Sequence, residues 1–399
     1  MATLKGKAVI GQSGGPTCVI NQTLVGAALQ AREHPEIEAL YGALHGIDGI
    51  LGENFIDLGA ESVETLERVA QTPSAGLGSV RRKPDQAAVR ELVSIFKKNG
   101  VRYLFYIGGN DSAETAHIVS ELSKEEGYEI RVCHLPKTID NDLRVTDHCP
   151  GYGSAARFVA LALMGDNLDN RSLGGVKIDV IMGRHAGFLT AAAGLGRQNE
   201  DDGPHLIYVP ERAFDIDKFC GDVDRMMTKH GRCLVAVSEG IAFADGSPVF
   251  TSGEKDSHGN VQLSGTGALG DFLSQQVKEK VGVKRVRADT FGYLQRCFPT
   301  ITSEVDAREA RAAGAFGMKA LASGETTGAS VSIRRTGEGS NYESELFLTE
   351  LSSVAKETRD LDDEFIAEAG NDTTEAFRQY ALPLVGELPV PGRLGAKKL

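Results

Sequence analysis

The amino-acid sequence predicts an α/β fold in which mainly parallel sheets are covered by helices. Short apolar runs alternate with segments that carry apolar residues at helical spacing, and this alternation continues through most of the 399 residues. Parallel strands need long crossover connections, and helices usually supply them. The chain is also longer than the roughly 100–200 residues of one domain. A stretch containing Pro and Gly at 149–153 interrupts the pattern, so we expect two domains with a boundary near residue 150.

Each expected element follows from its local pattern. Strands are expected at the short apolar runs 7–12, 38–44, 103–107, 130–135, 176–182, 205–209 and 233–238. Helices are expected where apolar residues recur at helical spacing, at 19–32, 62–71, 85–98, 112–126 and 215–230. The periodicity weakens from residue 302 onward. Residues 382–399 are rich in Pro and Gly, which predicts an extension along the surface.

Composition and charge disfavour several classes of function. Asp and Glu outnumber Lys and Arg by 55 to 43, and the net charge of −12 disfavours nucleic acid or an anionic membrane as the main partner. The six cysteines form no CxxC pair, which favours a reduced chain over a disulfide framework. The N-terminus shows no apolar leader, and no apolar stretch reaches the ~18 residues of a membrane span. We therefore expect a soluble, cytoplasmic protein.

In open α/β sheets, ligands bind beyond the carboxyl ends of the strands, so chemistry is expected in the loops that follow the apolar runs. The first such loop, 12–17, places Gly14 and Gly15 before a helix, where backbone N–H groups can bind an anion. A plain tight turn is an equally good interpretation of this loop alone. The basic turn at 78–83 contains Arg81, and by itself it is more typical of a solvated surface.

A third loop, at 107–112, combines two glycines with Asn110 and Asp111. A carboxylate at a strand-to-helix junction suits a magnesium–phosphate complex, because Mg²⁺ prefers one or two carboxylates together with substrate oxygens. A simple helix cap at Asp111 is the structural alternative.

The loop at 135–142 carries the most informative group of polar residues. Lys137, Asp140 and Asp142 follow a buried run directly. Two carboxylates two positions apart repel each other unless they share a cation or a proton-transfer task. An Asx turn with solvated charges is the structural alternative, but so many polar groups after a buried strand favour a chemical role.

Three later loops carry further candidates: 182–187, 238–240 and 287–296. In the last of them, Arg287, Tyr293 and Arg296 would form a cationic pocket for a phosphate monoester, because the guanidinium fork matches phosphate oxygens. The GxGxxG pattern at 265–270 lacks a convincing preceding strand. We interpret it as a loop and the start of a helix, and not as a dinucleotide-binding fingerprint.

In this order, the segments resemble those of the 6-phosphofructokinase family over roughly residues 5–325. The matching segments are SGGP at 13–16, GSVR at 78–81, GGNDS at 108–112, PKTIDND at 136–142, MGRHAG at 182–187, SEG at 238–240 and R-x₅-Y-x₂-R at 287–296. Each is weak alone, but the ordered set is highly specific. The resemblance implies two Rossmann-like three-layer α/β/α domains with the active site in the cleft between them. The implied divisions are a larger donor-side domain at 1–150 completed by part of 260–330, a smaller sugar-phosphate domain at 151–300, and a C-terminal extension at 326–399.

The resemblance also implies a role for each matching residue. Asp140 is expected to be the general base that accepts the proton of the sugar 1-hydroxyl. Thr138 and Asp142 would support the phosphoryl group and metal, and Arg184 would offset negative charge. The residues expected to hold fructose 6-phosphate are Met182, Gly183, Glu239, Tyr293, Arg296 and, from a neighbouring subunit, Arg287. The residues expected to line the phosphoryl-donor side are Gly15, Arg81, Asn110, Asp111 and Lys137.

Two positions bear on the phosphoryl donor. ATP-dependent members resemble GGDGS and PGTIDND, with glycine where this chain has Asp111 and Lys137. The two side chains would fill the space that a nucleotide α-phosphate needs, and Lys137 adds a positive charge for a compact anion. This is the pattern of the pyrophosphate-dependent branch, so the expected reaction is a reversible phosphoryl transfer from inorganic pyrophosphate to fructose 6-phosphate. An ATP-dependent enzyme and, less favoured, a non-catalytic regulatory subunit are the alternatives.

The resemblance further implies Mg²⁺ as cofactor and a homodimer or homotetramer, because Arg287 would complete a neighbour's site. Asn110 stands where most members carry Asp, so metal binding is expected to rest on Asp111, Asp140 or substrate oxygens. An arginine that many bacterial members place seven residues before the methionine of MGR corresponds to Gly175 here. Lys177 is a candidate for its replacement.

Overall fold

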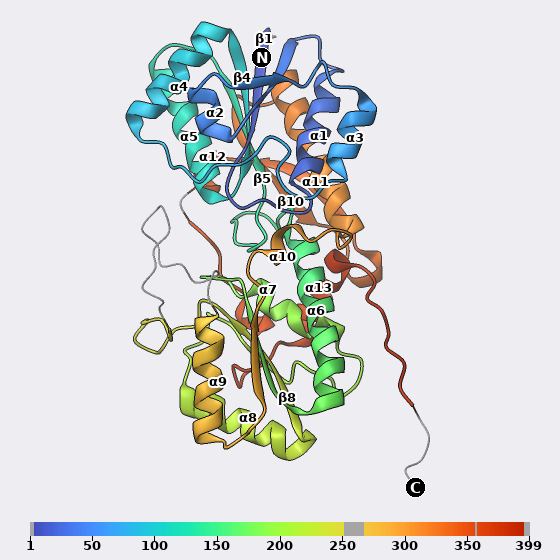
Figure 1. Ribbon diagram of the computed structural model, residues 1–399. Helices are drawn as coiled ribbons and strands as arrows, with labels where there is room; N and C mark the ends of the chain where they lie inside the picture. The colour runs from blue at the N-terminus through green and yellow to red at the C-terminus, as the bar shows by residue number, and fades with distance from the viewer. Residues whose placement is uncertain (1–3, 251–266, 356, 395–399) are drawn as a thin grey trace.

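The computed structural model describes residues 4–250, 267–355 and 357–394. They form two α/β regions that lie end to end, with the N-terminal strand in the upper one in Figure 1. The upper region is built on a seven-stranded sheet and the lower on a four-stranded sheet. Both sheets are mainly parallel, so the predicted fold class is confirmed. Across the described residues, every helix is too short or too polar to span a bilayer.

The large sheet draws on both ends of the chain. Its strands, in spatial order, are β11 (Ser344–Thr349), β10 (Gly328–Arg335), β5 (Arg131–Pro136), β4 (Val101–Gly108), β1 (Gly6–Gln12), β2 (Ile37–Ala43) and β3 (Phe55–Asp57). The two edge strands, β3 and β11, run antiparallel to their neighbours, and the inner strands are parallel. The carboxyl ends of β1, β4 and β5 therefore lie side by side and deliver their loops to one place.

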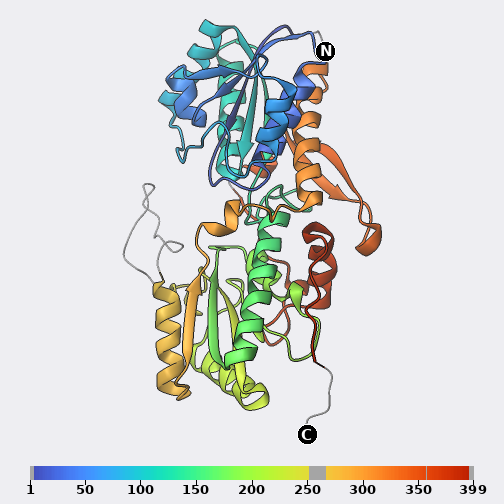
Figure 2. The same ribbon diagram turned by 45° about the vertical axis from the view of Figure 1, so that its right-hand side comes forward.

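Alternation along each strand divides the apolar side chains between two helical layers. Ala8 and Ile10 of β1 face one layer, and Val9 faces the other. The first layer contains α1 (Ile20–Ala31), α3 (Val63–Ala70) and α11 (Glu304–Ser323). The second contains α2 (Gly46–Leu51), α4 (Gln86–Asn99), α5 (Asn110–Glu125) and α12 (Leu351–Val354). Figure 2 shows the sheet edge-on between these layers.

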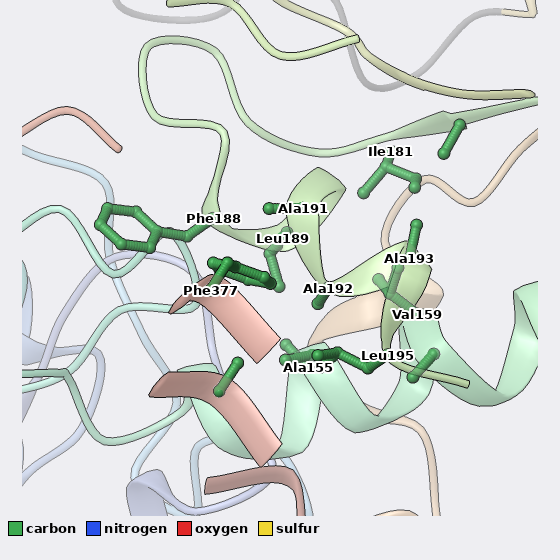
Figure 3. Packing of buried hydrophobic residues seen from close by; sticks show 14 of the residues in the cluster. Ala155, Val159, Ile181, Phe188, Leu189, Ala191, Ala192, Ala193, Leu195 and Phe377 are labelled. Carbon is green, nitrogen blue, oxygen red and sulfur yellow. The ribbon is translucent and has the colours of Figure 1, made fainter. Parts of the chain in front are cut away.

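The small sheet is entirely parallel. Its strands, in spatial order, are β7 (Leu206–Tyr208), β8 (Arg232–Ser238), β6 (Gly175–Ile181) and β9 (Val286–Thr290). One face packs on α8 (Ile216–His230) and α9 (Ala268–Lys280). The other packs on α6 (Tyr152–Leu173), α7 (Phe188–Ala191), the 3₁₀ turn η1 (Ala192–Gly196) and α13 (Glu375–Val385). Figure 3 shows this second core, in which Phe377 of α13 lies against Leu189 and the alanines that follow it.

The expected strands and helices are confirmed to within about two residues at each end, the usual scatter of boundaries. The C-terminal part differs from expectation. Residues 328–349 form β10 and β11 and complete the large sheet, whereas we expected everything from 326 onward to lie beyond the core. The surface extension expected at 382–399 is also wrong at its start, because Leu384 and Val385 are buried at the end of α13. Residues 395–399 lie outside the described part, as do 265–266 of the rejected GxGxxG pattern, which leads into α9.

Candidate active site

Loops from both sheets meet around α10 (Leu294–Cys297), the short helix between the two regions in Figure 1. Arg296 of α10 lies against the loop that follows β1. A methyl group placed on Gly15 would lie 3.1 Å from the guanidinium carbon of Arg296. The loop after β1 in the large sheet and the segment after β9 in the small sheet are therefore in direct contact.

Gly14 lets a lysine approach the loop after β1 closely. Its φ of +76° belongs to the left-handed region that favours glycine, and a methyl group there would lie 3.1 Å from the Lys137 ammonium. The main-chain N–H of Gly14 donates to the carbonyl of Val80 (3.0 Å), and the Ser79 hydroxyl donates to the carbonyl of Gly14 (2.6 Å). These hydrogen bonds join the loop at 12–17 to the basic turn at 78–83. They place Arg81 close enough for its charge to act on Lys137.

The three cations of the basic turn have different surroundings. Arg82 forms an ion pair with Asp48 (2.7 Å), and Lys83 forms one with Glu114 (2.6 Å). The positive charge of Arg81 acts instead on Lys137 and on the carboxylate of Asp140. Of the three cations in this turn, Arg81 is the one whose charge acts on the loop at 137–142, and its role on the donor side stays a prediction.

Lys137 is the most perturbed cation of the site. Its side chain is 4% exposed, and its main-chain N–H donates to the carbonyl of Gly108 (2.9 Å). Burial, and then the charges of Arg296 and Arg81, lower the pKa of Lys137 to about 8, while Asp140 opposes the shift. A buried ammonium near two guanidinium groups gains strongly from a multiply charged anion. This cluster therefore suits a compact phosphate ligand.

Asp140 and Asp142 face this cationic cluster from the same loop. Burial raises the pKa of Asp140, against the opposing charges of nearby cations that include Arg296 and Arg184. Burial, together with the charge of Asp140, raises the pKa of Asp142 to about 7. The Thr138 hydroxyl oxygen accepts the main-chain N–H of Asp140 (3.1 Å), which fixes the turn. Both carboxyl groups therefore hold a proton at a higher pH than an ordinary Asp does.

Asn110 and Asp111 lie at the start of α5, beside this loop. The Asn110 amide oxygen accepts the main-chain N–H of Asp111 (2.8 Å), and the Asp111 side chain is exposed. The cap position of α5 is Gly109, so the simple helix-cap interpretation of Asp111 is wrong. The carboxylate also contributes, after Glu114, to the raised pKa of Lys83.

The loop after β6 is fixed by the end of β8. Gly183 has φ +146°, and a methyl group there would lie 2.6 Å from the carbonyl oxygen of Ala186. The Ser238 hydroxyl donates to the Gly183 carbonyl, and the main-chain N–H of Glu239 donates to the carbonyl of Ile181 (2.9 Å). This tight turn holds the main chain of Arg184, whose charge acts on Asp140, against Gly240.

Gln295 joins the loop after β6 to α10. It is fully buried, and its amide oxygen accepts the main-chain N–H of Met182 (3.3 Å) while its amide nitrogen donates to the carbonyl of Gly292 (2.9 Å). It thereby places Tyr293 and Arg296, whose guanidinium carbon lies 4.6 Å from the Tyr293 ring centre. The sequence alone did not single out Gln295. Its position beside Arg296 in the R-x₅-Y-x₂-R segment was the available signal.

Arg287 lies apart from the other candidates. It is exposed on β9, an edge strand of the small sheet. Lys177, on the neighbouring strand, forms an ion pair with Asp289 and lies within 3.5 Å of Asp179 and 3.6 Å of Asp166. Lys177 therefore lies among three Asp side chains, and its role as a replacement phosphate ligand stays a prediction.

Comparison with known proteins places this geometry in a family. The family model described as "Phosphofructokinase" matches residues 7–321. The pyrophosphate–fructose 6-phosphate 1-phosphotransferase of Rhodospirillum rubrum is 54% identical over 386 residues, 96% of this chain and 95% of the relative. The protein of the same name from Methylococcus capsulatus is 38% identical over 384 residues, 94% and 90% of the two chains. The crystal structure of a pyrophosphate-dependent phosphofructokinase from Marinobacter aquaeolei, 32% identical, superposes with a TM-score of 0.85 over 98% of this chain and 94% of that one. This chain belongs to the phosphofructokinase family.

Proposed function

We propose that this chain transfers a phosphoryl group reversibly from inorganic pyrophosphate to the 1-hydroxyl of fructose 6-phosphate, giving fructose 1,6-bisphosphate and phosphate. The proposal rests on one observation: three cations lie close to two carboxylates. The cations are Arg81, Lys137 and Arg296, and the carboxylates are Asp140 and Asp142. Phosphoryl transfer needs positioning and neutralisation of charge more than covalent chemistry. The names of the relatives at up to 54% identity support the same reaction.

The buried Lys137 supports pyrophosphate over ATP as the donor. Its ammonium lies against Gly14, in the space next to the loop where a phosphate would approach the backbone. A side chain in that place adds a charge for a compact anion and removes room for a larger nucleotide. An ATP-dependent enzyme would gain nothing from this arrangement.

Asp140 acts as the general base of the forward reaction. Burial raises its pKa above that of an ordinary Asp, which makes the carboxylate a stronger base. Arg184 and Lys137 stabilise the negative charge that spreads over the phosphoryl oxygens in the transition state. A purely regulatory subunit would have no use for this carboxylate loop facing cations from the other sheet.

The donor set near α5 fits a magnesium ion. Asp111 offers one exposed carboxylate, while the amide oxygen of Asn110 already accepts a main-chain N–H. One carboxylate with several phosphate oxygens is the coordination that Mg²⁺ prefers. Asp111 would hold the ion, which when bound supplies charge neutralisation to pyrophosphate.

Arg287 completes the sugar-phosphate site of a neighbouring subunit in this proposal. The side chain is exposed on an edge strand, apart from Tyr293 and Arg296. In a homodimer or homotetramer, Arg287 would contact the 6-phosphate of the substrate that is bound to the neighbouring subunit. Closed symmetry is usual for such assemblies.

The test is an assay of the purified chain with Mg²⁺ and each of two donors, pyrophosphate and ATP, against fructose 6-phosphate and sedoheptulose 7-phosphate. We expect fructose 1,6-bisphosphate with pyrophosphate and a far lower rate with ATP. A higher rate with ATP would overturn the donor, and no transfer with either donor would overturn the function.

The two directions of the reaction should respond oppositely to acid. Forward transfer needs Asp140 deprotonated. Burial raises the pKa of Asp140, and the pKa of its neighbour Asp142 is raised to about 7, so the forward rate should fall with acid at a higher pH than an ordinary Asp would give. The reverse reaction needs Asp140 protonated, so its rate should fall as the pH rises. Lys137, with a pKa of about 8, should weaken pyrophosphate binding in more alkaline solution. Rate profiles measured in both directions from about pH 3 to 10 check this; a forward rate that falls only near pH 4, where an ordinary Asp titrates, would contradict it.

A further inference from the structure

The chain after α12 returns to the catalytic loop at 137–150 and runs along it. The main-chain N–H of Arg359 donates to the carbonyl of Asp142 (2.9 Å), and Thr358 pairs with Leu143 in an antiparallel bridge. These residues lie beyond residue 321, where the family match ends. A segment outside the match therefore contacts the loop that carries the catalytic carboxylates.

The guanidinium of Arg359 donates hydrogen bonds to three main-chain carbonyl groups of this loop. Nε donates to Asn141 (2.9 Å), Nη1 to Thr146 (3.0 Å) and Nη2 to Asp147 (2.7 Å). The guanidinium carbon also lies 4.9 Å from the centre of the Phe188 ring. The guanidinium donates from three nitrogen atoms spread over one plane, whereas all N–H groups of a lysine belong to a single atom, so a lysine at this position would lose most of these bonds.

Tyr380 of α13 holds the residue between the two catalytic carboxylates. Asn141 is fully buried with φ +60°, a region that residues other than glycine rarely adopt. Its amide nitrogen donates to the Tyr380 hydroxyl (2.8 Å), which in turn donates to the carbonyl of Asp147 (2.9 Å). The amide oxygen of Asn141 accepts the main-chain N–H of Cys149 (2.9 Å). Contacts from outside the loop thus help to maintain an unfavourable backbone conformation inside it.

The same C-terminal segment also reaches the loop that carries Arg184. One carboxylate oxygen of Glu211 accepts the main-chain N–H of Gly187 (2.7 Å) and that of Leu361 (2.8 Å). Gly187 closes the turn that begins at Met182 and contains Arg184. Residues 359–361 are therefore tied to a loop of each sheet.

We propose that residues 358–361 and Tyr380 fix the catalytic carboxylates relative to Arg184, with Arg359 and Tyr380 as positioning residues. The inference rests on the proposed function, since it assigns these residues to the same reaction. Neither side chain contacts the reacting groups directly; each acts through Asn141 and its neighbours. Misplacement of a catalytic group by about 1 Å can cost about 100-fold in rate, so loss of this fastening should lower turnover.

The first experiment compares the kinetics of Arg359→Lys and Tyr380→Phe with wild type. We expect Arg359→Lys to lower kcat by about 10–100-fold with KM values for both substrates within about threefold, and Tyr380→Phe to give a smaller loss. The matched control is Arg378→Lys. Arg378 lies on α13, the helix that carries Tyr380, but it donates to the carbonyl of Leu195 (2.8 Å), away from the catalytic loop. An equal loss of kcat in this control would show a general structural effect and overturn the proposal.

The second experiment measures amide hydrogen exchange without substrates. Exchange across residues 138–149 should be at least about tenfold faster in both test variants, and unchanged in Arg378→Lys, because the loop opens locally once its fastening is lost. If wild type is inactive with every donor, the proposed function fails. The exchange measurement still tests whether Arg359 and Tyr380 hold the loop at 138–149. If Arg359→Lys does not fold, the kcat and amide exchange of Tyr380→Phe, which removes only one hydroxyl, test the proposal instead. Unchanged exchange and kcat in the folded variants would overturn the proposal.

Discussion

Replacing Asp140 with asparagine should lower the forward kcat by about 10²–10⁴-fold, the usual contribution of a positioned general base. Asparagine has nearly the same volume, so KM values should change little. The raised pKa of Asp140 means that its ionised form is disfavoured in the folded protein. At neutral pH the neutral amide should therefore leave the melting temperature unchanged or raise it, because the repulsion with Asp142 is removed.

Steady-state kinetics with a thermal unfolding scan checks both parts of this expectation. The control is Asp224→Asn, the same change at an exposed position on α8. Full turnover in Asp140→Asn would remove Asp140 from the chemistry. A large fall in melting temperature would instead show that the carboxylate stabilises the fold.

Lys137→Gly should weaken the use of pyrophosphate most among the donor-side changes. Removing one partner of a buried charged contact typically costs about 2–5 kcal/mol, which corresponds to at least about a 30-fold loss in kcat/KM for pyrophosphate. The variant also removes the side chain that lies against Gly14. Combined with Asp111→Gly, it should raise the rate with ATP above that of wild type.

The measurement is kcat/KM for both donors in wild type, the single variant and the double variant. Lys284→Gly, which removes an exposed lysine from a loop far along the chain, controls for loss of net charge. If the double variant gains no activity with ATP, side-chain bulk at these two positions does not set the choice of donor. If pyrophosphate kinetics stay unchanged, the buried ammonium does not contact the donor.

The strand-end loops could be predicted from the sequence because their chemistry is local. Glycines, carboxylates and cations stand next to one another in 12–17 and 135–142, and a parallel sheet brings such loops together whatever lies between them. Arg359 could not be found this way. Its partners are main-chain carbonyls, which every residue has, so nothing in 141–147 marks them as the targets of a distant arginine.

We expected no strand at 328–335, and the burial of its serines could not be predicted for a similar reason. β10 alternates Ala329, Val331 and Ile333 with serines, a pattern that usually marks a strand with one face in water. Ser330 is nevertheless buried, because its hydroxyl oxygen lies 2.8 Å from Nδ1 of His134 on β5. A polar side chain can lie inside a sheet when a specific partner satisfies it, and that partner is far away in the sequence.

The place of β10 beside β5 has a consequence for how the protein is made. Val132 pairs with Gly328, so β5 leaves the ribosome long before its neighbour exists. At about 5–20 residues per second, the nascent chain carries that open edge for about 10–40 s. During that time the unpaired backbone groups of β5 can form hydrogen bonds with an extended segment of another chain. All four strands of the small sheet are synthesised within this interval, so the large sheet is completed after the small one.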